Sequence, residues 1–455
     1  MIDFEQFVEY SKPGPRYTSY PTAPEFSDDF DADDYEEILK SQDKNRKLSL
    51  YFHMPFCRSA CYFCGCNVVF TSKEEKKERY IEYLLKEIRI LSRSLDTSRD
   101  ILQLHFGGGT PTFFDAKQLE RIIKAIWHSF PNIAEDAEIS CEIDPRFLTQ
   151  DQMSVLAENG FNRISFGVQD FDEKVQREVH RIQPFDITKS AVDIARDAGI
   201  TSINMDLIYG LPYQSQESFS KTLEKSLELD IDRYAIFNYA HVPWMKKTMR
   251  KFDETTLPNP KEKLAIMRST IDFLNSNGYQ MIGMDHFAKP TDELFLAIEK
   301  GELHRNFQGY TTKGGADLIG VGLTSIGEGL THYVQNFRDM SEYEAAIDSE
   351  KLPVMRGLAL SDDDVVRKTV IMEMMSNFKL NIKNINKRFN IDFFDYFKDV
   401  IKELQIFMDE GLITLEKESL HVSDTGTLLI RNICMPFDAY LKKVPEELRR
   451  FSKTV

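Results

Sequence analysis

One stretch of the sequence decides how the rest of this chain is interpreted. It reads Tyr51-Phe-His-Met-Pro-Phe-Cys-Arg-Ser-Ala-Cys-Tyr-Phe-Cys-Gly-Cys66. It holds Cys57, Cys61, Cys64 and Cys66, out of 6 cysteines in the whole sequence. The first three have a Cys-x3-Cys-x2-Cys spacing, which lets one loop deliver three thiolates to three irons of a cluster and leaves a fourth iron without a protein ligand. An iron with an open position is available for chemistry.

Other uses of such a loop agree less well with the sequence. Disulfide frameworks are typical of small secreted chains rather than of 455 residues. A structural zinc site usually joins two separated ligand clusters, and no second cluster with that spacing occurs here. A ferredoxin closes the coordination of its cluster with a fourth cysteine, and Cys66 could be that ligand. However, the loop would be strained if both thiols of the Cys-x-Cys unit bound irons of one cluster. We therefore favour three ligands.

The composition predicts a folded protein whose main partner is not nucleic acid. Hydrophobic residues at 42% and aromatic residues at 12% exclude disorder, and 455 residues suggest one large domain with one or two smaller ones. A net charge of −16 disfavours phosphate binding, so any anionic ligand must find a locally basic pocket. The acidic start and the short apolar runs predict a cytoplasmic protein without a membrane partner.

Apolar, β-rich strings alternate with amphipathic stretches over the first three quarters of the chain, which predicts parallel β/α units. Residues Tyr80–Leu91, for example, form a single apolar stripe at helical spacing. The predicted strands are Leu48–His53, Ile101–Phe106, Ala137–Glu142, Arg163–Gln169, Ser202–Tyr209 and Arg233–His241.

Polar and glycine-rich residues stand at the carboxyl end of every predicted strand, where barrels of parallel strands place their active sites. An open doubly wound sheet would instead collect such groups at one switch point. We therefore expect an α/β fold with a full or, more specifically, a partial (β/α)6 barrel over residues 41–350. Residues 1–40 are expected to form an N-terminal arm over the barrel mouth.

Residues 351–455 are expected to form a C-terminal, mostly helical, winged-helix-like domain. Helices are predicted through Met374 and over Asp395 to Met408, followed by a hairpin over Gly411–Val422. Such modules often bind DNA, but this region has nearly equal numbers of acidic and basic residues. A lid or buttress for the barrel is therefore the preferred interpretation.

The cysteine loop, the Gly-Gly-Gly-Thr-Pro-Thr loop at residues 107–112 and the polar strand ends resemble the radical S-adenosylmethionine (SAM) superfamily. Within it, the chain resembles the family of oxygen-independent coproporphyrinogen III oxidases along nearly its whole length. The segments that carry this resemblance are Pro13–Thr22, the loop that ends in Cys66, Arg163–Asp170, Asp206–Pro212, Phe237–His241, Gly283–Ala288, His304–Thr312 and Arg431–Met435.

The resemblance implies a 4Fe-4S cluster and two SAM molecules as cofactors, and coproporphyrinogen III as substrate. In this family, a 5'-deoxyadenosyl radical takes a hydrogen from each of two propionates, which lose carbon dioxide and become the vinyl groups of protoporphyrinogen IX. The implied partners are an electron donor such as flavodoxin or ferredoxin and an acceptor that the sequence does not identify. A monomer is expected.

The resemblance also implies a set of site residues. The cluster ligands would be Cys57, Cys61 and Cys64. The first SAM would meet Tyr51, Phe63, Gly108, Gly109, Thr110 and Glu142. The second would meet Gln169, Arg181, Asp206 and Ala240, with Ile326 against an adenine. Tyr51 and Cys66 are the expected catalytic residues, with Cys66 facing the substrate or donating hydrogen.

The substrate carries four carboxylates, which arginine binds well with its two-pronged geometry. Arg16 is the first candidate, because its segment is too rich in proline and aromatic residues for a free tail. Tyr17, Tyr20, His304 and Arg305 are further candidates. The simpler alternative is that Arg16 only pairs with surface acids.

Two related functions remain as alternatives, a heme chaperone that keeps the cluster motif and a methyltransferase that opens heme. Relatives of the chaperone type generally lack the fourth cysteine and the PGPRYTSYPT arm and carry an HNxxYW motif, whereas this chain has His304-Arg-Asn-Phe-Gln-Gly-Tyr310. One departure from the family pattern is acidic Glu328, close to Ile326, which could alter the second SAM pocket.

Overall fold

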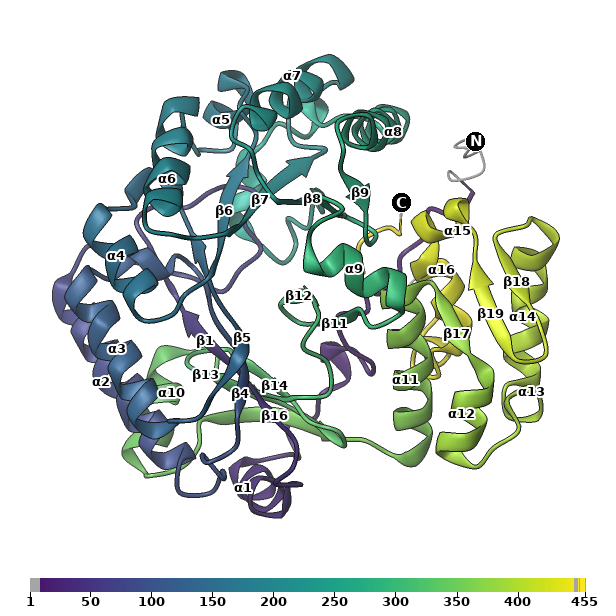
Figure 1. Cartoon of the computed structure of the whole chain (residues 1–455), viewed down its shortest axis with the longest axis horizontal. Helices are drawn as coiled ribbons and strands as arrows, with labels where there is room; N and C mark the ends of the chain where they lie inside the picture. The colour runs from purple at the N-terminus through teal and green to yellow at the C-terminus, as the bar shows by residue number, and fades with distance from the viewer. Residues whose placement is uncertain (1–8, 446–448, 450, 455) are drawn as a thin grey trace.

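The structure is a computed structural model that describes residues 9–445, 449 and 451–454 (Figure 1). Its framework is a 12-stranded sheet that curves around an interior. In spatial order the strands are β16 (Val354–Ala359), β15 (His332–Asn336), β14 (Ile326–Glu328), β13 (Asp317–Val321), β1 (Leu48–Met54), β4 (Ile101–Gly108), β5 (Ile133–Ile143), β6 (Arg163–Gln169), β7 (Ser202–Tyr209), β8 (Arg233–Asn238), β10 (His286–Ala288) and β9 (Gln280–Met281).

The six central strands β1 and β4 to β8 are parallel, and β13 adds to β1 in the same direction. They are the six strands predicted from the sequence, with identical bounds for β6 and β7. The flanking strands β14 to β16 and β9 to β10 are antiparallel. Within the described residues the edge strands β16 and β9 do not pair with each other, so the prediction of a partial barrel is confirmed.

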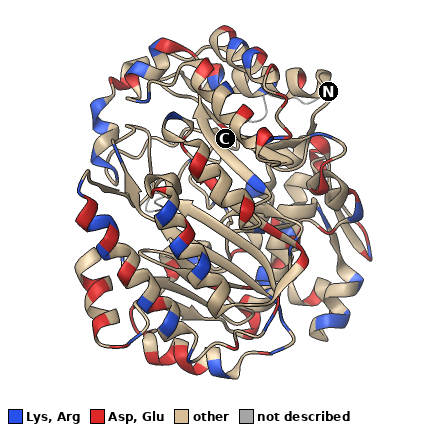
Figure 2. Cartoon of the chain, turned by 60° about the vertical axis from the view of Figure 1, so that its left-hand side comes forward, with Lys and Arg blue, Asp and Glu red and all other residues tan. Residues whose placement is uncertain are grey.

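Helices cover the outer face of this sheet (Figure 1). The predicted stripe belongs to α2, which begins earlier than expected, at Glu74, and buries Leu84 and Ile88. Charged residues lie mainly on the helices and loops (Figure 2). The helices connected to the central strands are α2 (Glu74–Leu91), α3 (Ala116–Ser129), α4 (Gln150–Glu158), α5 (Glu173–Glu178), α6 (Phe185–Asp197), α7 (Gln216–Leu227) and α8 (Pro260–Ser276), and α10 (Met340–Asp348), which joins β15 to β16, contacts α2.

Alternation along the strands separates an apolar outer face from a polar inner face. In β6, Ile164, Phe166 and Val168 are buried, whereas the intervening Ser165 and Gln169 are only partly buried. Successive side chains of a strand point to opposite faces. Because the apolar set packs under the helices, the polar set of each strand lines the interior of the partial barrel.

The C-terminal region packs beside the barrel (Figure 1). The predicted hairpin is present as β18 (Ile413–Leu415) and β19 (Ser419–Val422), with β17 (Lys379–Asn381) as a third strand. The helices are α11 (Asp362–Asn377), α12 (Ile382–Phe389), α13 (Phe393–Tyr396), α14 (Lys398–Asp409), α15 (Asp424–Leu428) and α16 (Ile430–Cys434). The large sheet continues past residue 350, because β16 still pairs with β15.

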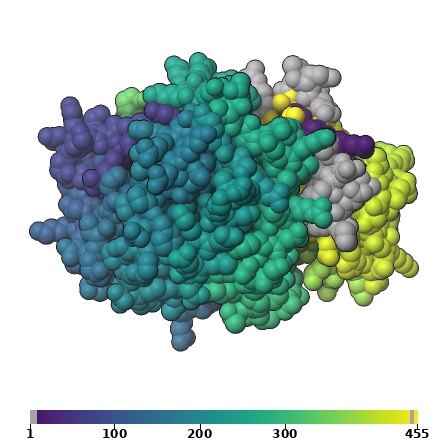
Figure 3. Space-filling view, turned by 90° about the horizontal axis from the view of Figure 1, so that it is seen from above, coloured from purple at the N-terminus to yellow at the C-terminus, as the bar shows by residue number. Residues whose placement is uncertain are grey.

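The two ends of the described chain meet between the barrel and the C-terminal region (Figure 3). Pro13 and Lys453 form an antiparallel bridge, and the Gly14 amide donates to the Ser452 carbonyl at 3.2 Å. After this segment, α1 (Ala32–Ser41) contacts β16 at the sheet edge. Among the described residues, no helix has the length and apolar composition that crossing a bilayer requires.

Candidate active site

The cysteine loop leaves β1 and is held by main-chain contacts on both sides. The Tyr62 amide donates to the Val179 carbonyl at 3.0 Å, and the Val69 amide donates to the Pro55 carbonyl at 2.7 Å. All four loop cysteines are free thiols, with Cys66 the most exposed. The remaining two, Cys141 and Cys434, are buried, as expected for small apolar residues.

Cationic side chains approach the thiols of this loop. Arg181 Nη1 lies 3.5 Å from Cys61 Sγ, and Arg146 Nη2 lies 4.0 Å from the same atom. Asp144 holds both guanidinium groups through its Oδ2, at 3.2 Å and 2.6 Å. A hydrogen bond from Cys66, with the charges of Lys246 and Arg181, lowers the pKa of Cys64 to about 6. The surroundings therefore favour the thiolate, the form that binds iron, at Cys64, whereas burial raises the pKa of Cys57 to about 12.

The thiols fit an iron–sulfur cluster better than a single metal ion. In the described part of the chain, no three Cys, His, Asp or Glu side chains converge as one ion requires. Thiolates that bind separate irons of a cluster stand farther apart than the ligands of one ion. Three partly exposed thiols on one loop, beside two arginines, are the donor set that such a cluster needs.

The glycine loop after β4 packs directly on the cysteine loop. Gly109 donates to the Met54 carbonyl at 2.8 Å, and Thr110 donates to the Phe56 carbonyl at 3.0 Å. A Cβ on Gly109 would stand 2.7 Å from the Phe56 oxygen and 2.9 Å from the Pro55 carbonyl carbon. Thr110 Oγ1 also lies 3.7 Å from Cys57 Sγ. Glycine is required here because the two backbones touch.

Glu142, at the end of β5, joins the glycine loop to a pair of aromatic rings. Its Oε2 accepts from the Gly108 amide, and its Oε1 accepts from His105 Nε2, both at 3.2 Å. Burial alone would raise the pKa of Glu142, but these hydrogen bonds and the charge of His105 outweigh burial and lower it. The carboxylate is therefore ionised and can accept from ammonium or hydroxyl groups.

Tyr51 stacks on the other side of His105, with ring centroids 5.9 Å apart. Its hydroxyl lies 3.0 Å from His53 Nδ1, and His53 Nε2 lies 3.1 Å from the Asn67 carbonyl oxygen. The carbonyl can only accept, so His53 donates to it and Tyr51 donates to His53. The structure thus brings together Tyr51, Gly108 and Glu142, three residues of the predicted first SAM site, around His105.

The residues expected around the second SAM start at the ends of β6 and β7. Gln169 has a positive φ of 74° where the register between β6 and β7 shifts, a strained conformation for this residue type. Asp206 accepts from Ser165 at 3.0 Å and from Asn204 at 2.7 Å. Burial and the nearby Glu142 raise the pKa of Asp206 to about 7. The Arg181 guanidinium already donates hydrogen bonds to Asp144 and to the Gly167 carbonyl.

Ala240 and Ile326 belong to segments near opposite ends of the strand order. Ala240 follows β8 and lines a large cavity, whereas Ile326 begins β14, beyond β13 and β1 in the strand order. Glu328 pairs with Lys368 of α11 at 2.8 Å. Its charge is thus already compensated at the contact between the sheet and the C-terminal region.

Arg16 and Arg305, two of the substrate candidates, converge on one carboxylate. Arg16 Nη2 lies 3.1 Å and Arg305 Nη1 lies 4.0 Å from oxygens of Asp285. Although burial opposes it, His286 and both arginines lower the pKa of Asp285. Arg305 is buried, and its Nε and Nη1 have no hydrogen-bond partner among the described residues. This pair can therefore receive a further anion.

Tyr17, Tyr20 and His304 occupy other surroundings. Tyr17 is buried and donates to Asp438 at 3.0 Å, and the Tyr20 hydroxyl, also buried, accepts from the Ala439 amide at 3.1 Å. His304 is exposed at the start of β11 (His304–Asn306). None of the three is among the described residues that line the large cavity.

Sequence reasoning missed several groups that complete the site. His105 holds Glu142, and Asp285 collects the arginines. Asp144 was recognised from the sequence as a polar residue at a strand end, but its role in holding Arg181 was not. His105 could have been found, because it alternates with apolar residues in β4 and so faces the interior. Asp285 lay inside a segment that carried the family resemblance, without an assigned role.

Comparisons with known proteins agree with this arrangement. The Radical SAM superfamily model matches residues 51–225, which contain the cysteine loop, the glycine loop, Glu142 and Asp206. The HemN C-terminal domain model matches residues 360–429. Both matches fall on separate parts of the fold, the first on the parallel strands and the second on the C-terminal helices.

Relatives match the chain over its full length. An oxygen-independent coproporphyrinogen III oxidase from Helicobacter pylori is 55% identical over 457 residues, which cover 100% of this chain and 99% of the relative. The protein of that name from Escherichia coli is 44% identical, with 100% and 98% covered. A solved structure of coproporphyrinogen III oxidase from Escherichia coli, described as a radical SAM enzyme, superposes with a TM-score of 0.92 at 43% identity, covering 97% of this chain and 100% of that one.

Proposed function

This chain belongs to the oxygen-independent coproporphyrinogen III oxidase family of radical SAM enzymes, and from that premise we propose that it converts coproporphyrinogen III to protoporphyrinogen IX in heme biosynthesis. Each of two propionate side chains loses one hydrogen atom, one electron and carbon dioxide, and becomes a vinyl group. The observation that carries this proposal is the full-length match together with the three-thiol loop beside Glu142 and the glycine loop.

When bound, the 4Fe-4S cluster and SAM supply the one-electron chemistry that yields a 5'-deoxyadenosyl radical. The chain's own residues would bind and orient the cluster and SAM. Cys57, Cys61 and Cys64 would hold the cluster, and Arg181 offsets the negative charge of the thiolates. Glu142 and the backbone of Gly108 to Thr110 would receive the polar groups of SAM, with Phe63 and Tyr51 beside them.

We assign a second SAM to Gln169, Arg181, Asp206 and Ala240, with Ile326 against its adenine. Support comes from the strained Gln169 at a strand end and from the inward-facing Asp206, whose pKa is raised to about 7. Equilibrium dialysis of reconstituted protein with labelled SAM tests this stoichiometry. Two bound molecules per chain are expected, and one would refute the second site.

Tyr51 and Cys66 are proposed as the catalytic residues. The Tyr51 hydroxyl is oriented by His53, and the backbone carbonyl of Cys66 accepts from Lys246 at 2.9 Å. Cys66 therefore sits at the exposed end of the loop, where it can face substrate or donate hydrogen. The domain arrangement proposed with these roles is an arm over 1–40, a barrel over 41–350 and a helical domain over 351–455.

We further propose that the protein works in the cytoplasm as a monomer with an electron donor such as flavodoxin or ferredoxin. Support for the location is the substrate of its relatives, an intermediate of heme biosynthesis.

The function is tested by anaerobic incubation of reduced, reconstituted protein with SAM and coproporphyrinogen III. We expect carbon dioxide, 5'-deoxyadenosine and protoporphyrinogen IX. Tight heme binding without decarboxylation would instead favour the heme chaperone, and methylated, opened heme would favour the methyltransferase. Both alternatives agree less well with relatives that bear the oxidase name over their full length.

A further inference from the structure

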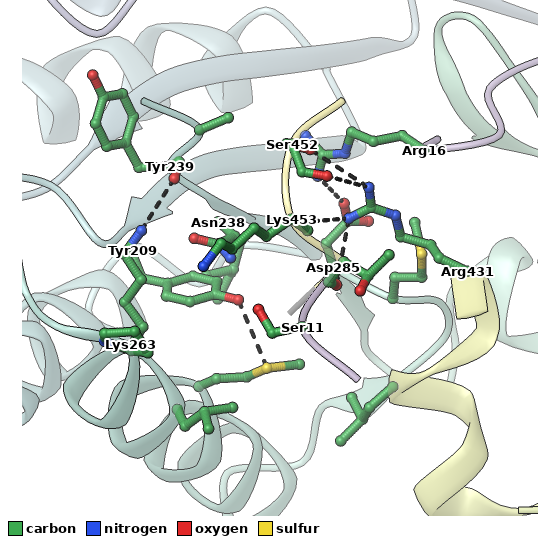
Figure 4. A pocket seen from close by; sticks show the side chains of 18 of the residues that line it. Ser11, Arg16, Tyr209, Asn238, Tyr239, Lys263, Asp285, Arg431, Ser452 and Lys453 are labelled. Atoms are coloured by element: carbon green, nitrogen blue, oxygen red, sulfur yellow. Dashed lines mark hydrogen bonds and ion pairs between the residues drawn. The ribbon is translucent and has the colours of Figure 1, made fainter. Parts of the chain in front are cut away.

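A cavity of about 1040 Å³ lies where the barrel, the N-terminal segment and the C-terminal tail meet (Figure 4). Ala240 places one wall next to the proposed second SAM site. Its apolar lining includes Ile236, Leu264, Met267, Met281, Met284 and Phe287. A volume of this size is at the upper end of what small-molecule sites provide, so it suits a large, mostly apolar ligand.

The charges that line this cavity are opposite to those of the chain as a whole. Among the described lining residues, Asp285 is the one carboxylate, in a chain with a net charge of −16. The basic lining residues are Arg16, Lys263, Arg431, Arg449 and Lys453. Such a local reversal of charge favours a ligand with several negative groups.

Of these five cations, only Arg16 has a counter-ion among the described residues, and Arg431 and Arg449 are held by main-chain carbonyls. Lys263 and Lys453 carry the remaining two charges. In the described part of the chain, no carboxylate lies within 4.0 Å of either ammonium group. Lys263 Nζ makes a 3.3 Å hydrogen bond to the Tyr239 carbonyl. Burial and the charge of Lys453 both lower the pKa of Lys263. Two ammonium groups that repel each other in a half-buried cavity gain stability from a shared anion.

An unpaired acceptor lines the same cavity. The side-chain oxygen Oδ1 of Asn238 is buried and has no hydrogen-bond partner in the described structure. Figure 4 shows Lys263, Lys453, Asn238 and Tyr209 in the same part of the cavity. A lone carbonyl oxygen suits an N–H donor such as a pyrrole, which an inorganic anion does not provide.

We propose that Lys263 and Lys453 together hold one propionate carboxylate of the tetrapyrrole, one that is retained in the product, while the ring system packs on the apolar walls beside Asn238. This inference rests on the proposed function and adds two positioning residues to it. The retained carboxylate anchors the ring, and rotation about the anchor presents the other propionates to the site near Glu142.

The experiment measures binding rather than turnover. Coproporphyrin III, the oxidised and fluorescent form of the substrate with the same four propionates, is titrated into reconstituted wild type and Lys263→Met. We expect about tenfold weaker binding in the variant, because one charge-assisted contact is lost. Lys453→Met should behave alike, and Lys263→Arg should restore most of the affinity.

Lys261→Met is the matched control, since Lys261 is exposed on the same helix. Its affinity for the porphyrin should equal that of the wild type, and the tetramethyl ester of coproporphyrin III should bind wild type and Lys263→Met equally. Unchanged coproporphyrin III affinity in Lys263→Met would overturn the proposal. So would weaker SAM binding with unchanged porphyrin binding, because the ammonium would then serve the SAM carboxylate. A wild type that binds the porphyrin but does not decarboxylate coproporphyrinogen would refute the function and leave the binding result standing.

Discussion

Asp206 has a different pKa in the folded protein and in the unfolded chain, and this difference makes the stability of the protein depend on pH. Its pKa is raised from 3.8 to about 7 by burial and by Glu142. Between pH 3.8 and about pH 7, the Asp206 carboxyl keeps its proton in the folded protein and loses it in the unfolded chain. Stability is therefore lost as pH rises through this interval, and the loss is complete above pH 7.

Asp206→Asn removes this dependence and keeps a similar shape. We expect the melting temperature of the variant minus that of the wild type to increase by about 2 °C between pH 5 and 7. Above pH 7 this difference should stay constant. Scanning calorimetry without SAM checks this. The raised pKa values of Asp170 and Glu87 occur in both proteins and cancel in the difference. Parallel curves for the two proteins would contradict the assignment.

Cys57 offers the direct test of the cluster. Cys57→Ala should lose the cluster absorbance and the activity and keep the melting temperature within about 2 °C, because the thiol is only partly buried and its side-chain contact is a weak one with Thr110. Cys434→Ala is the control, since Cys434 is a buried thiol far along the chain from the loop and should keep the full cluster. Retention of a complete cluster by Cys57→Ala would show that the ligand set is different.

Among the structural elements, the contact between the cysteine loop and the glycine loop is the one that aligns the site. In Gly109→Ala the new methyl group meets main-chain atoms of Pro55 and Phe56, which cannot turn away as a side chain could. The glycine loop must shift, and such overpacking costs about 1–3 kcal/mol.

We expect Gly109→Ala to bind SAM at least about tenfold more weakly, because the backbone groups of this loop move away from Glu142. Equilibrium dialysis measures the affinity, and circular dichroism checks the fold. Gly65→Ala is the matched control, because its Cβ would meet nothing within 4 Å. Equal SAM affinities in the two variants would mean that the loop contact does not position the cofactor.

For the molecule as a whole, sequence periodicity was enough to predict the central strands and the partial barrel. The alternation in β6 and β7 is local information, and so is the spacing of Cys57, Cys61 and Cys64. Contacts between distant segments carry no such signal. Nothing near Lys263 in the sequence shows that the C-terminal tail will place Lys453 in the same cavity.

Arg431 of α16 is the clearest of these long-range contacts. It is buried and donates to the carbonyl oxygens of Gly14, Pro15, Ser452, Lys453 and Thr454, so one side chain holds both ends of the chain. Those carbonyls lose their donor in Arg431→Met, and each buried unpaired group costs about 1–3 kcal/mol. The two chain ends are therefore expected to loosen together.

Hydrogen exchange should rise in parallel over residues 12–17 and 452–454 of Arg431→Met, with a lower melting temperature. Coproporphyrin III affinity should also fall, because Lys453 and Arg16 are carried by these same segments and lose their positions in the cavity. Arg388→Met, at an exposed arginine of α12, is the control and should change none of these readouts. Faster exchange at one chain end alone would mean that the two ends are anchored independently, and Arg431 would then be a local contact rather than the joint between them.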